Sequence, residues 1–174
     1  MSRSVQERGT TEMTSDERPV LVAAGLVWRP DDVLLVQRRR ADAEHGAGLW
    51  ELPGGKLERA EHPRDALARE LAEEWGPAAA GLLVGPVAEV LHHVYPPPGP
   101  EVLLVVYHVD ARGLGPAGAP IEALGLRPEP GVELGAFARV ALPVAEFLAA
   151  DRGLVEAVRD GAIAAPAAGW RAAP

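Results

Sequence analysis

Apolar and polar positions along the chain follow two different periods, and these predict an alternation of strands and helices. Short apolar runs rich in Val and Leu, each bounded by Gly, Pro or Asp, are typical of strands. Strands are expected over residues 20–28, 33–37, 82–95, 102–109 and 132–140. The fourth run is almost continuously apolar, which predicts a strand buried on both faces. The run 82–95 predicts one or two strands, because Gly85 and Pro86 interrupt it.

Helical spacing is clearest over residues 63–75. Leu67, Leu71 and Trp75 recur at i, i+4 and i+8 and are predicted to face the core. Pro63 suits a first helical turn, and Gly76 followed by proline indicates where the helix ends. A second helix is expected over 145–150 and 154–160, interrupted near a glycine at position 153.

The first helix also carries a face made of carboxylates. Glu70, Glu73 and Glu74 fall at i, i+3 and i+4, where like charges repel each other. A run of this kind is usually a solvated helix face. Here it stands at a fixed distance from the pair Gly54-Gly55, and a hard cation such as Mg²⁺ would relieve the repulsion by taking several oxygen ligands. The pattern therefore favours a metal site.

The spacing from Gly55 to Gly76 is G-x5-E-x7-R-E-U-x-E-E-x-G, where U is aliphatic. With average residue frequencies, a chance match at one start position is roughly 10⁻⁹. The pattern resembles the Nudix box, and it departs from it only at Pro77, where an aliphatic residue is usual. The resemblance covers roughly residues 20–160. It implies an α/β fold, the Nudix α/β/α sandwich, in which a mixed β-sheet lies between helices.

The same resemblance implies a set of site residues. The metal ligands would be the carbonyl of Gly54 and the carboxylates of Glu70, Glu73 and Glu74, holding Mg²⁺ with Mn²⁺ as the alternative ion. Arg69 would orient the neighbouring carboxylates. Either Glu73 or a carboxylate in a later loop would accept a proton from the attacking water. The loop candidates are Glu122, Glu129 and Glu133, of which Glu129 is preferred.

Three further residues are predicted to contact the substrate. Segments 37–43, 49–56 and 149–157 resemble the MutT branch, whose members hydrolyse oxidised guanine nucleotides or cytidine triphosphates. Arg39 is expected near the base or the phosphates. Lys56 is either a solvated loop cation or a phosphate contact, and both alternatives stay open. Asp151 either caps the helix over 154–160 or reads the base, or does both.

The expected function is metal-dependent cleavage of a diphosphate bridge in a small nucleotide. The favoured substrate is a nucleoside triphosphate, oxidised or normal, giving the monophosphate and pyrophosphate, as in sanitation of the nucleotide pool. ADP-ribose, nucleotide sugars and dinucleoside polyphosphates are the alternatives, because the box reads only the shared diphosphate. A second class is a nucleotide-binding domain without activity, which the loss of a box carboxylate would favour; none is lost.

Composition narrows the class of protein. The 174 residues suit one domain, and the absence of cysteine excludes disulfides, thiolate metal sites and cysteine nucleophiles. A net charge of −8 argues against binding nucleic acid polymers, and no apolar run suits a membrane span. A cytoplasmic monomer or homodimer is expected. Residues 1–18 are predicted to be a disordered extension, 19–161 the Nudix domain and 162–174 a flexible tail.

Overall fold

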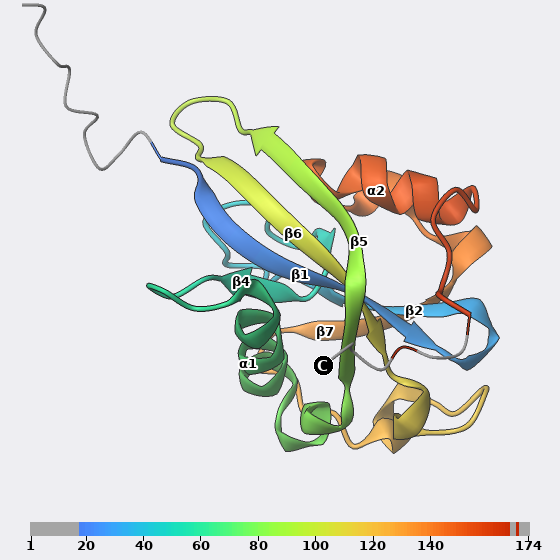
Figure 1. Cartoon of the computed structure of the whole chain (residues 1–174). Helices are drawn as coiled ribbons and strands as arrows, with labels where there is room; N and C mark the ends of the chain where they lie inside the picture. Colours follow the sequence, from blue (N-terminus) through green and yellow to red (C-terminus); the bar gives the residue numbers. More distant parts are fainter. Residues whose placement is uncertain (1–17, 168–169, 171–174) are drawn as a thin grey trace, which may run out of the picture.

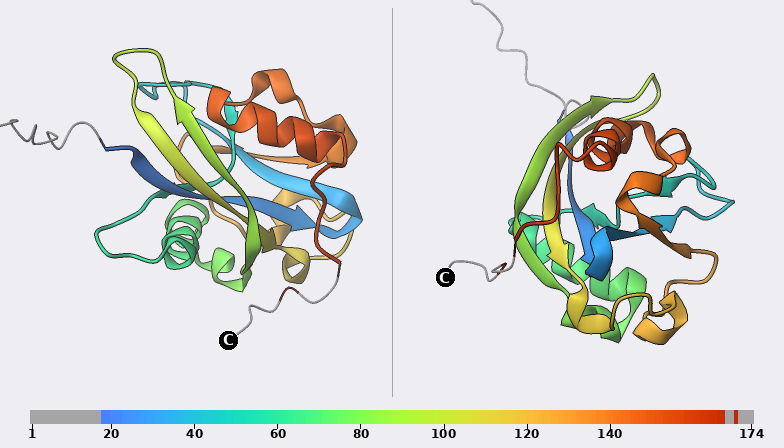
Figure 2. Two further views of the ribbon diagram at one scale, coloured as in Figure 1. Left: turned by 45° about the horizontal axis from the view of Figure 1, so that its top comes forward. Right: turned by 90° about the vertical axis from the view of Figure 1, so that its right-hand side faces the viewer.

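One mixed sheet organises the part of the chain that this computed structural model describes, residues 18–167 and 170. Its seven strands run in the order β3-β2-β1-β6-β5, with β4 paired to β1 and β7 paired to β2. Helices α1 and α2 lie on opposite faces of this sheet (Figures 1 and 2). The elements are β1 (Val20–Arg29), β2 (Val33–Arg38), β3 (Trp50–Glu51), β4 (Gly54–Lys56), α1 (Pro63–Trp75), β5 (Leu83–Val94), β6 (Glu101–Asp110), β7 (Glu133–Ala138) and α2 (Ala149–Arg159). The predicted α/β sandwich with a mixed sheet is confirmed.

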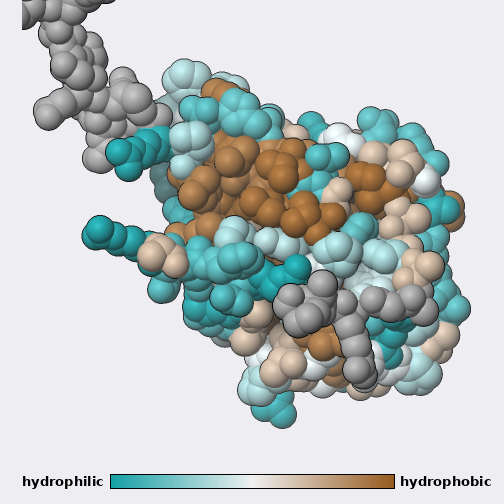
Figure 3. Space-filling model, viewed as in Figure 1, coloured by the Kyte–Doolittle hydropathy of each residue, from teal (hydrophilic) through white to brown (hydrophobic). Residues whose placement is uncertain are grey.

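The parallel pairing of β1 with β6 lies at the centre of the sheet, from Val20 opposite Val102 to Trp28 opposite Asp110. Burial on both faces was predicted for β6. It holds only for the second half of this strand, because Leu103 and Val105 remain half-buried. Helix α1 does not cover the sheet there. Exposed valines of β5 extend the same apolar surface, which Figure 3 shows over β1, β5 and β6.

Helix α1 has the predicted bounds, 63–75. The side chain of His62 caps it by accepting a hydrogen bond from the Arg64 N–H, and Pro63 occupies the first turn. Leu67, Leu71 and Trp75 are buried against the sheet, as predicted. The polar side of α1 therefore faces outward, toward the loop that precedes the helix.

Helix α2 differs from the prediction because it runs without a break through Arg152 and Gly153. Nothing lies within 4 Å of a Cβ placed at Gly153, so that position faces solvent and only helix propensity is lost there. The buried stripe of Leu154, Val155 and Val158 holds the helix on the sheet. Within residues 18–167 and 170, neither α-helix has the length and apolar character needed to cross a bilayer.

Strand β5 agrees with one of the two alternatives predicted for residues 82–95. It is one strand and not two, because Gly85 and Pro86 are accommodated by irregularities in its pairing with β6 near Val87. The loop that leads into α1 and carries Gly54 and Gly55, called the box loop below, also contains regular structure. It forms two very short strands, of which β3 pairs with β2 and β4 pairs with β1.

The end of the described chain packs on the core, whereas the sequence predicted a flexible tail from residue 162. Ile163 and Ala165 contact the cluster beneath α2, and Trp170 is only 6% exposed. The Trp170 ring meets the His108 ring edge to face at 5.9 Å. An Ala/Pro/Gly-rich composition indicated mobility, but Ile163, Ala165 and Trp170 bury apolar surface on the core. Residues 1–17 lie outside the described part of the chain.

Replacing Trp170 with alanine is expected to lower the melting temperature. Truncating a buried tryptophan costs about 3 kcal/mol, and for a chain of this length each kcal/mol corresponds to roughly 2–4 °C. A decrease of about 6 °C or more by scanning calorimetry is therefore predicted. Val140→Ala is the control, because that apolar side chain is 71% exposed. An unchanged melting temperature for Trp170→Ala would show that the segment contributes nothing to stability.

Candidate active site

Two glycines let the backbone of the box loop lie close to β1 and α1. Gly54 has φ +140°, and a Cβ there would lie 2.1 Å from the carbonyl oxygen of Ala23. Only glycine fits this position without strain. A Cβ on Gly55 would lie 2.3 Å from the carboxyl carbon of Glu70. The loop backbone and the helix carboxylate are therefore in direct contact, with no side chain between them.

Arg69 holds the carboxylates on the exposed side of α1. Its Nε and Nη2 donate to the two oxygens of Glu61, both at 2.9 Å. Its Nη1 donates to Glu70 at 2.9 Å and to Glu73 at 3.3 Å, and its Nη2 also reaches the carbonyl of Lys56 at 3.1 Å. The guanidinium lowers the pKa of Glu61 to about 2, so this carboxylate stays ionised. The Arg69 guanidinium thus bonds to the loop before the helix, to Glu61 and to two carboxylates of α1 at the same time.

Glu74 lies deeper than the other box carboxylates. Its Oε2 accepts a hydrogen bond from the Gly54 N–H at 3.3 Å, and its Oε1 accepts one from Gln37 at 3.1 Å. Burial raises the pKa of Glu74 to about 7, and the nearby charges of Glu51 and Glu70 act in the same direction. A cation bound beside it would favour the ionised form.

Gln37 and Glu51 belong to this site, although the sequence did not single them out. Gln37 is buried on β2, and its amide nitrogen lies 3.2 Å from Glu51 and 3.1 Å from Glu74. Arg39 pairs with Glu51 from the other side at 2.6 Å. The available signal was a polar residue at the end of an otherwise apolar strand, since a buried amide needs hydrogen-bond partners.

The donor set fits a hard divalent cation. The carbonyl of Gly54 and the carboxylates of Glu70, Glu73 and Glu74 supply only oxygen atoms, the ligands that Mg²⁺ and Mn²⁺ prefer. Direct contact of the Gly55 backbone with Glu70 places loop and helix donors on one small surface. Over residues 18–167 and 170, no three acidic or histidine side chains already stand in metal-binding geometry. Arg69 bonds to one oxygen of Glu70 and one of Glu73, so acceptor positions remain on both carboxylates, and the side chains would have to converge to bind an ion.

The three later carboxylates make different contacts with the rest of the structure. The backbone N–H of Glu129 donates to the carbonyl of Glu74 at 3.1 Å, which fixes that loop at the end of α1. Glu133 instead pairs with Arg38 at 3.3 Å, and Glu122 is exposed in a short 3-10 turn. Of the three candidates, Glu129 is the one whose backbone bonds to the box helix. Its role in catalysis stays a prediction.

A cavity of about 220 Å³ adjoins the carboxylate surface. It lies between the box loop, β1, β6 and the start of α2. Arg39, Lys56 and Asp151, the three residues predicted to contact a substrate, all line it. Gly54 and Gly55 form its end nearest Glu70. Residues far apart in the sequence are thus brought to one cleft that has basic, acidic and apolar walls.

Asp151 does not cap α2, because it lies within the first turn and Leu148 occupies the N-cap position. Its Oδ2 accepts a hydrogen bond from the Leu52 N–H at 3.1 Å, which links α2 to the box loop. The side chain is buried, and burial raises its pKa to about 7. The helix-cap alternative is therefore wrong, and a buried carboxyl faces the cleft.

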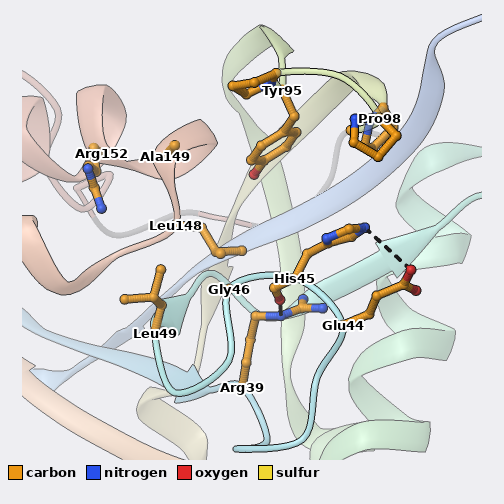
Figure 4. A pocket seen from close by; sticks show the side chains of 13 residues that line it. Arg39, Glu44, His45, Gly46, Leu49, Tyr95, Pro98, Leu148, Ala149 and Arg152 are labelled. Atoms are coloured by element: carbon orange, nitrogen blue, oxygen red, sulfur yellow. Dashed lines mark hydrogen bonds and ion pairs between the residues drawn. The ribbon is translucent and has the colours of Figure 1, made fainter.

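A larger cavity of about 550 Å³ opens beside the first, and the two share Arg39, Tyr95 and Leu148. Figure 4 shows Tyr95 on one side of the hollow and Arg39 and His45 on the other. The guanidinium of Arg39 is held by the carbonyl of His45 at 2.9 Å as well as by Glu51. Arg39 therefore stands at the junction of both cavities.

Comparison with known proteins agrees with this geometry. The family profile described as NUDIX domain matches residues 18–150. The chain therefore belongs to the Nudix family. A MutT NUDIX hydrolase from Burkholderia pseudomallei has a similar structure, with a TM-score of 0.60 and 28% identity over 80% of this chain and 98% of that one.

Curated relatives are similar over the box region. An 8-oxo-dGTP diphosphatase of Escherichia coli is 44% identical over 55 residues, which cover 32% of this chain and 42% of that protein. A CTP pyrophosphohydrolase of the same organism is 47% identical over 55 residues, or 32% of this chain and 39% of the relative. The chain thus spans less than half the length of these relatives.

Proposed function

We propose that this protein is a metal-dependent nucleotide pyrophosphohydrolase acting on a nucleoside triphosphate. The observation that carries the proposal is the cleft itself. The Gly54–Gly55 backbone, which contacts the box carboxylate Glu70, forms one end of it, and the buried Asp151 forms a wall. The names of the curated relatives support the same class of reaction.

The residues divide the chemistry between them. A divalent ion held by Gly54, Glu70, Glu73 and Glu74 would neutralise phosphate charge and lower the pKa of a water. Glu73 is more exposed than Glu70 and is the proposed acceptor of the proton from the attacking water, with Glu129 as the alternative. This division leaves Glu70 and Glu74, which contact the loop, as fixed ligands.

The substrate contacts follow from the cleft walls. Lys56 is exposed beside the carboxylate surface, in position to meet the phosphates. Arg39 stands at the opposite side, where the cavities join. Asp151 would read the base. An ionised carboxylate only accepts hydrogen bonds, and guanine offers donors at N1 and the 2-amino group. That the preferred guanine is the oxidised form is proposed only from the name of a curated relative.

The base-reading role predicts a pH dependence of specificity. Because the pKa of Asp151 is about 7, its ionised form becomes populated as the pH rises from 6 to 8. The ratio of kcat/KM for dGTP to that for dTTP should therefore increase across this range. Using a ratio cancels titrations that affect both substrates. Asp151→Asn should flatten the ratio and lower it about tenfold, since a hydrogen bond to a charged group contributes about 1.5–3 kcal/mol.

The measurement, with Mg²⁺, is steady-state release of pyrophosphate from 8-oxo-dGTP, dGTP, dCTP, CTP and dTTP. For ADP-ribose, whose hydrolysis gives AMP and ribose 5-phosphate, it is the formation of AMP. If Asp151→Asn lowers every kcat/KM by the same factor, Asp151 supports the loop through Leu52 and does not read a base. If the wild type cleaves ADP-ribose but no triphosphate, the alternative substrate class replaces the proposed one.

A further inference from the structure

The buried amide of Gln37 lies between two carboxylates and an indole. Its Nε2 donates to Glu51 at 3.2 Å and to Glu74 at 3.1 Å, while its Oε1 accepts from the Trp75 Nε1–H at 2.6 Å. The side chain is 2% exposed and lines neither cavity. Gln37 therefore acts on the cleft only through the residues that it contacts.

Chemistry alone fixes the orientation of this amide. The indole N–H of Trp75 can only donate, and an ionised carboxylate can only accept. If the amide were turned over, its NH₂ group would face the indole N–H, and its carbonyl would face both carboxylates. Each of those three contacts would then be repulsive. Trp75 consequently keeps both amide hydrogens directed at Glu51 and Glu74.

The position of Glu74 depends on this arrangement. The Gly54 N–H holds one of its oxygens and Gln37 holds the other, so the carboxyl plane is set by two donors from separate elements. A carboxylate has about four acceptor positions, so two remain for a metal ion. Glu51 would otherwise repel Glu74, and the Gln37 amide lies between them while Arg39 pairs with the far oxygen of Glu51.

We propose that Gln37, locked by Trp75, is a positioning residue that presents Glu74 to the metal ion. The inference rests on the proposed function, because it takes Glu74 as a metal ligand. Residues that orient a metal ligand typically change metal affinity by about 10- to 100-fold when they are replaced. An effect of that size is expected here, although Gln37 itself contacts neither metal nor nucleotide.

The experiment measures Mn²⁺ binding by electron paramagnetic resonance without nucleotide, together with Mg²⁺-dependent turnover. Gln37→Glu keeps the shape and removes the donor, and Gln37→Met removes the amide without adding a charge. Both should weaken Mn²⁺ binding by about 10- to 100-fold. Because Gln37 lines neither cavity, the variants should lower kcat at saturating nucleotide while the nucleotide KM changes less than threefold.

A double-mutant cycle separates positioning from general packing. Trp75→Phe keeps a buried aromatic ring and removes the N–H that locks the amide, so it should weaken Mn²⁺ binding in the wild-type background. With Gln37→Met there is no amide left to orient, and adding Trp75→Phe should not weaken binding further. Additive losses would assign both effects to packing and overturn the inference.

The controls also distinguish the two proposals. Wild-type protein that binds Mn²⁺ and hydrolyses nucleotides, beside a folded Gln37→Met variant with unchanged Mn²⁺ affinity, would overturn the positioning role and leave the proposed function intact. Wild-type protein that neither binds Mn²⁺ nor hydrolyses any nucleotide would remove the proposed function and the inference together. Melting temperatures identify variants that fail to fold, and Trp75→Phe then supplies the test.

Discussion

Replacing Glu73 with glutamine should reduce turnover on the order of 10²-fold or more. Glutamine keeps the shape of the side chain but removes the charge, and one preorganised electrostatic group in an active site is typically worth that much. Folding should be unaffected, because the Glu73 side chain is 58% exposed and its one described ion pair is with Arg69 at 3.3 Å. Turnover with saturating nucleotide and Mg²⁺ is the measurement, and chelation of the metal should abolish it in both proteins.

Glu156→Gln is a matched control, since that side chain is 57% exposed and also pairs with an arginine, at 3.1 Å, on the other helix. It should retain nearly full activity. A folded Glu73→Gln protein with wild-type turnover would remove Glu73 from the chemistry. A large loss in Glu129→Gln would then move the proton-accepting role to the later loop.

Arg69→Lys should lower turnover by about 10- to 100-fold, the usual effect of disturbing residues that orient metal ligands. The guanidinium contacts Glu61, Glu70, Glu73 and the carbonyl of Lys56 at once. A lysine ammonium keeps the charge but cannot reproduce a planar, bidentate contact. Because the carboxylates would lose their orientation, the Mg²⁺ concentration for half-maximal rate should increase, and added Mg²⁺ should restore part of the activity.

Arg112→Lys provides the comparison at a remote bidentate pair. Arg112 binds Asp110 at 2.8 and 2.7 Å, at the end of β6 distant from the box loop. The same substitution there should leave the Mg²⁺ dependence unchanged. If Arg69→Lys also kept its turnover and its Mg²⁺ dependence within a factor of two, the charge of Arg69 would suffice and its geometry would be unimportant.

The elements that could be predicted correctly from the sequence are those with clear local signals. Helix α1 has an apolar stripe, a proline at its start and a glycine at its end, and its bounds were correct. Helix α2 was divided wrongly, because Gly153 looked like a break while the stripe of Leu154, Val155 and Val158 that overrides it acts through tertiary packing. Packing of Trp170 on the core was missed for the same reason.

The site shows the same division between local and long-range information. Box spacing placed Glu70, Glu74 and Arg69 beside the glycine loop, because those residues are close in the sequence and share one helix. The contribution of Gln37 could not be predicted from spacing, since its partners lie 14, 37 and 38 residues away on other elements. Asp151 was found by resemblance, but its contact with Leu52 required the structure.

The order of elements along the chain also means that the two sides of the cleft are synthesised at different times. Residues 20–76 include β1, the box loop and α1, so the glycine end of the cleft and the carboxylates beside it come from one continuous segment. Asp151 reaches Leu52 from 99 residues further on. At a synthesis rate of roughly 5–20 residues per second, the ribosome completes the box several seconds before it makes α2. A nascent chain therefore carries the box carboxylates and the glycine end of the cleft while the Asp151 wall is still missing, and the cleft is completed last.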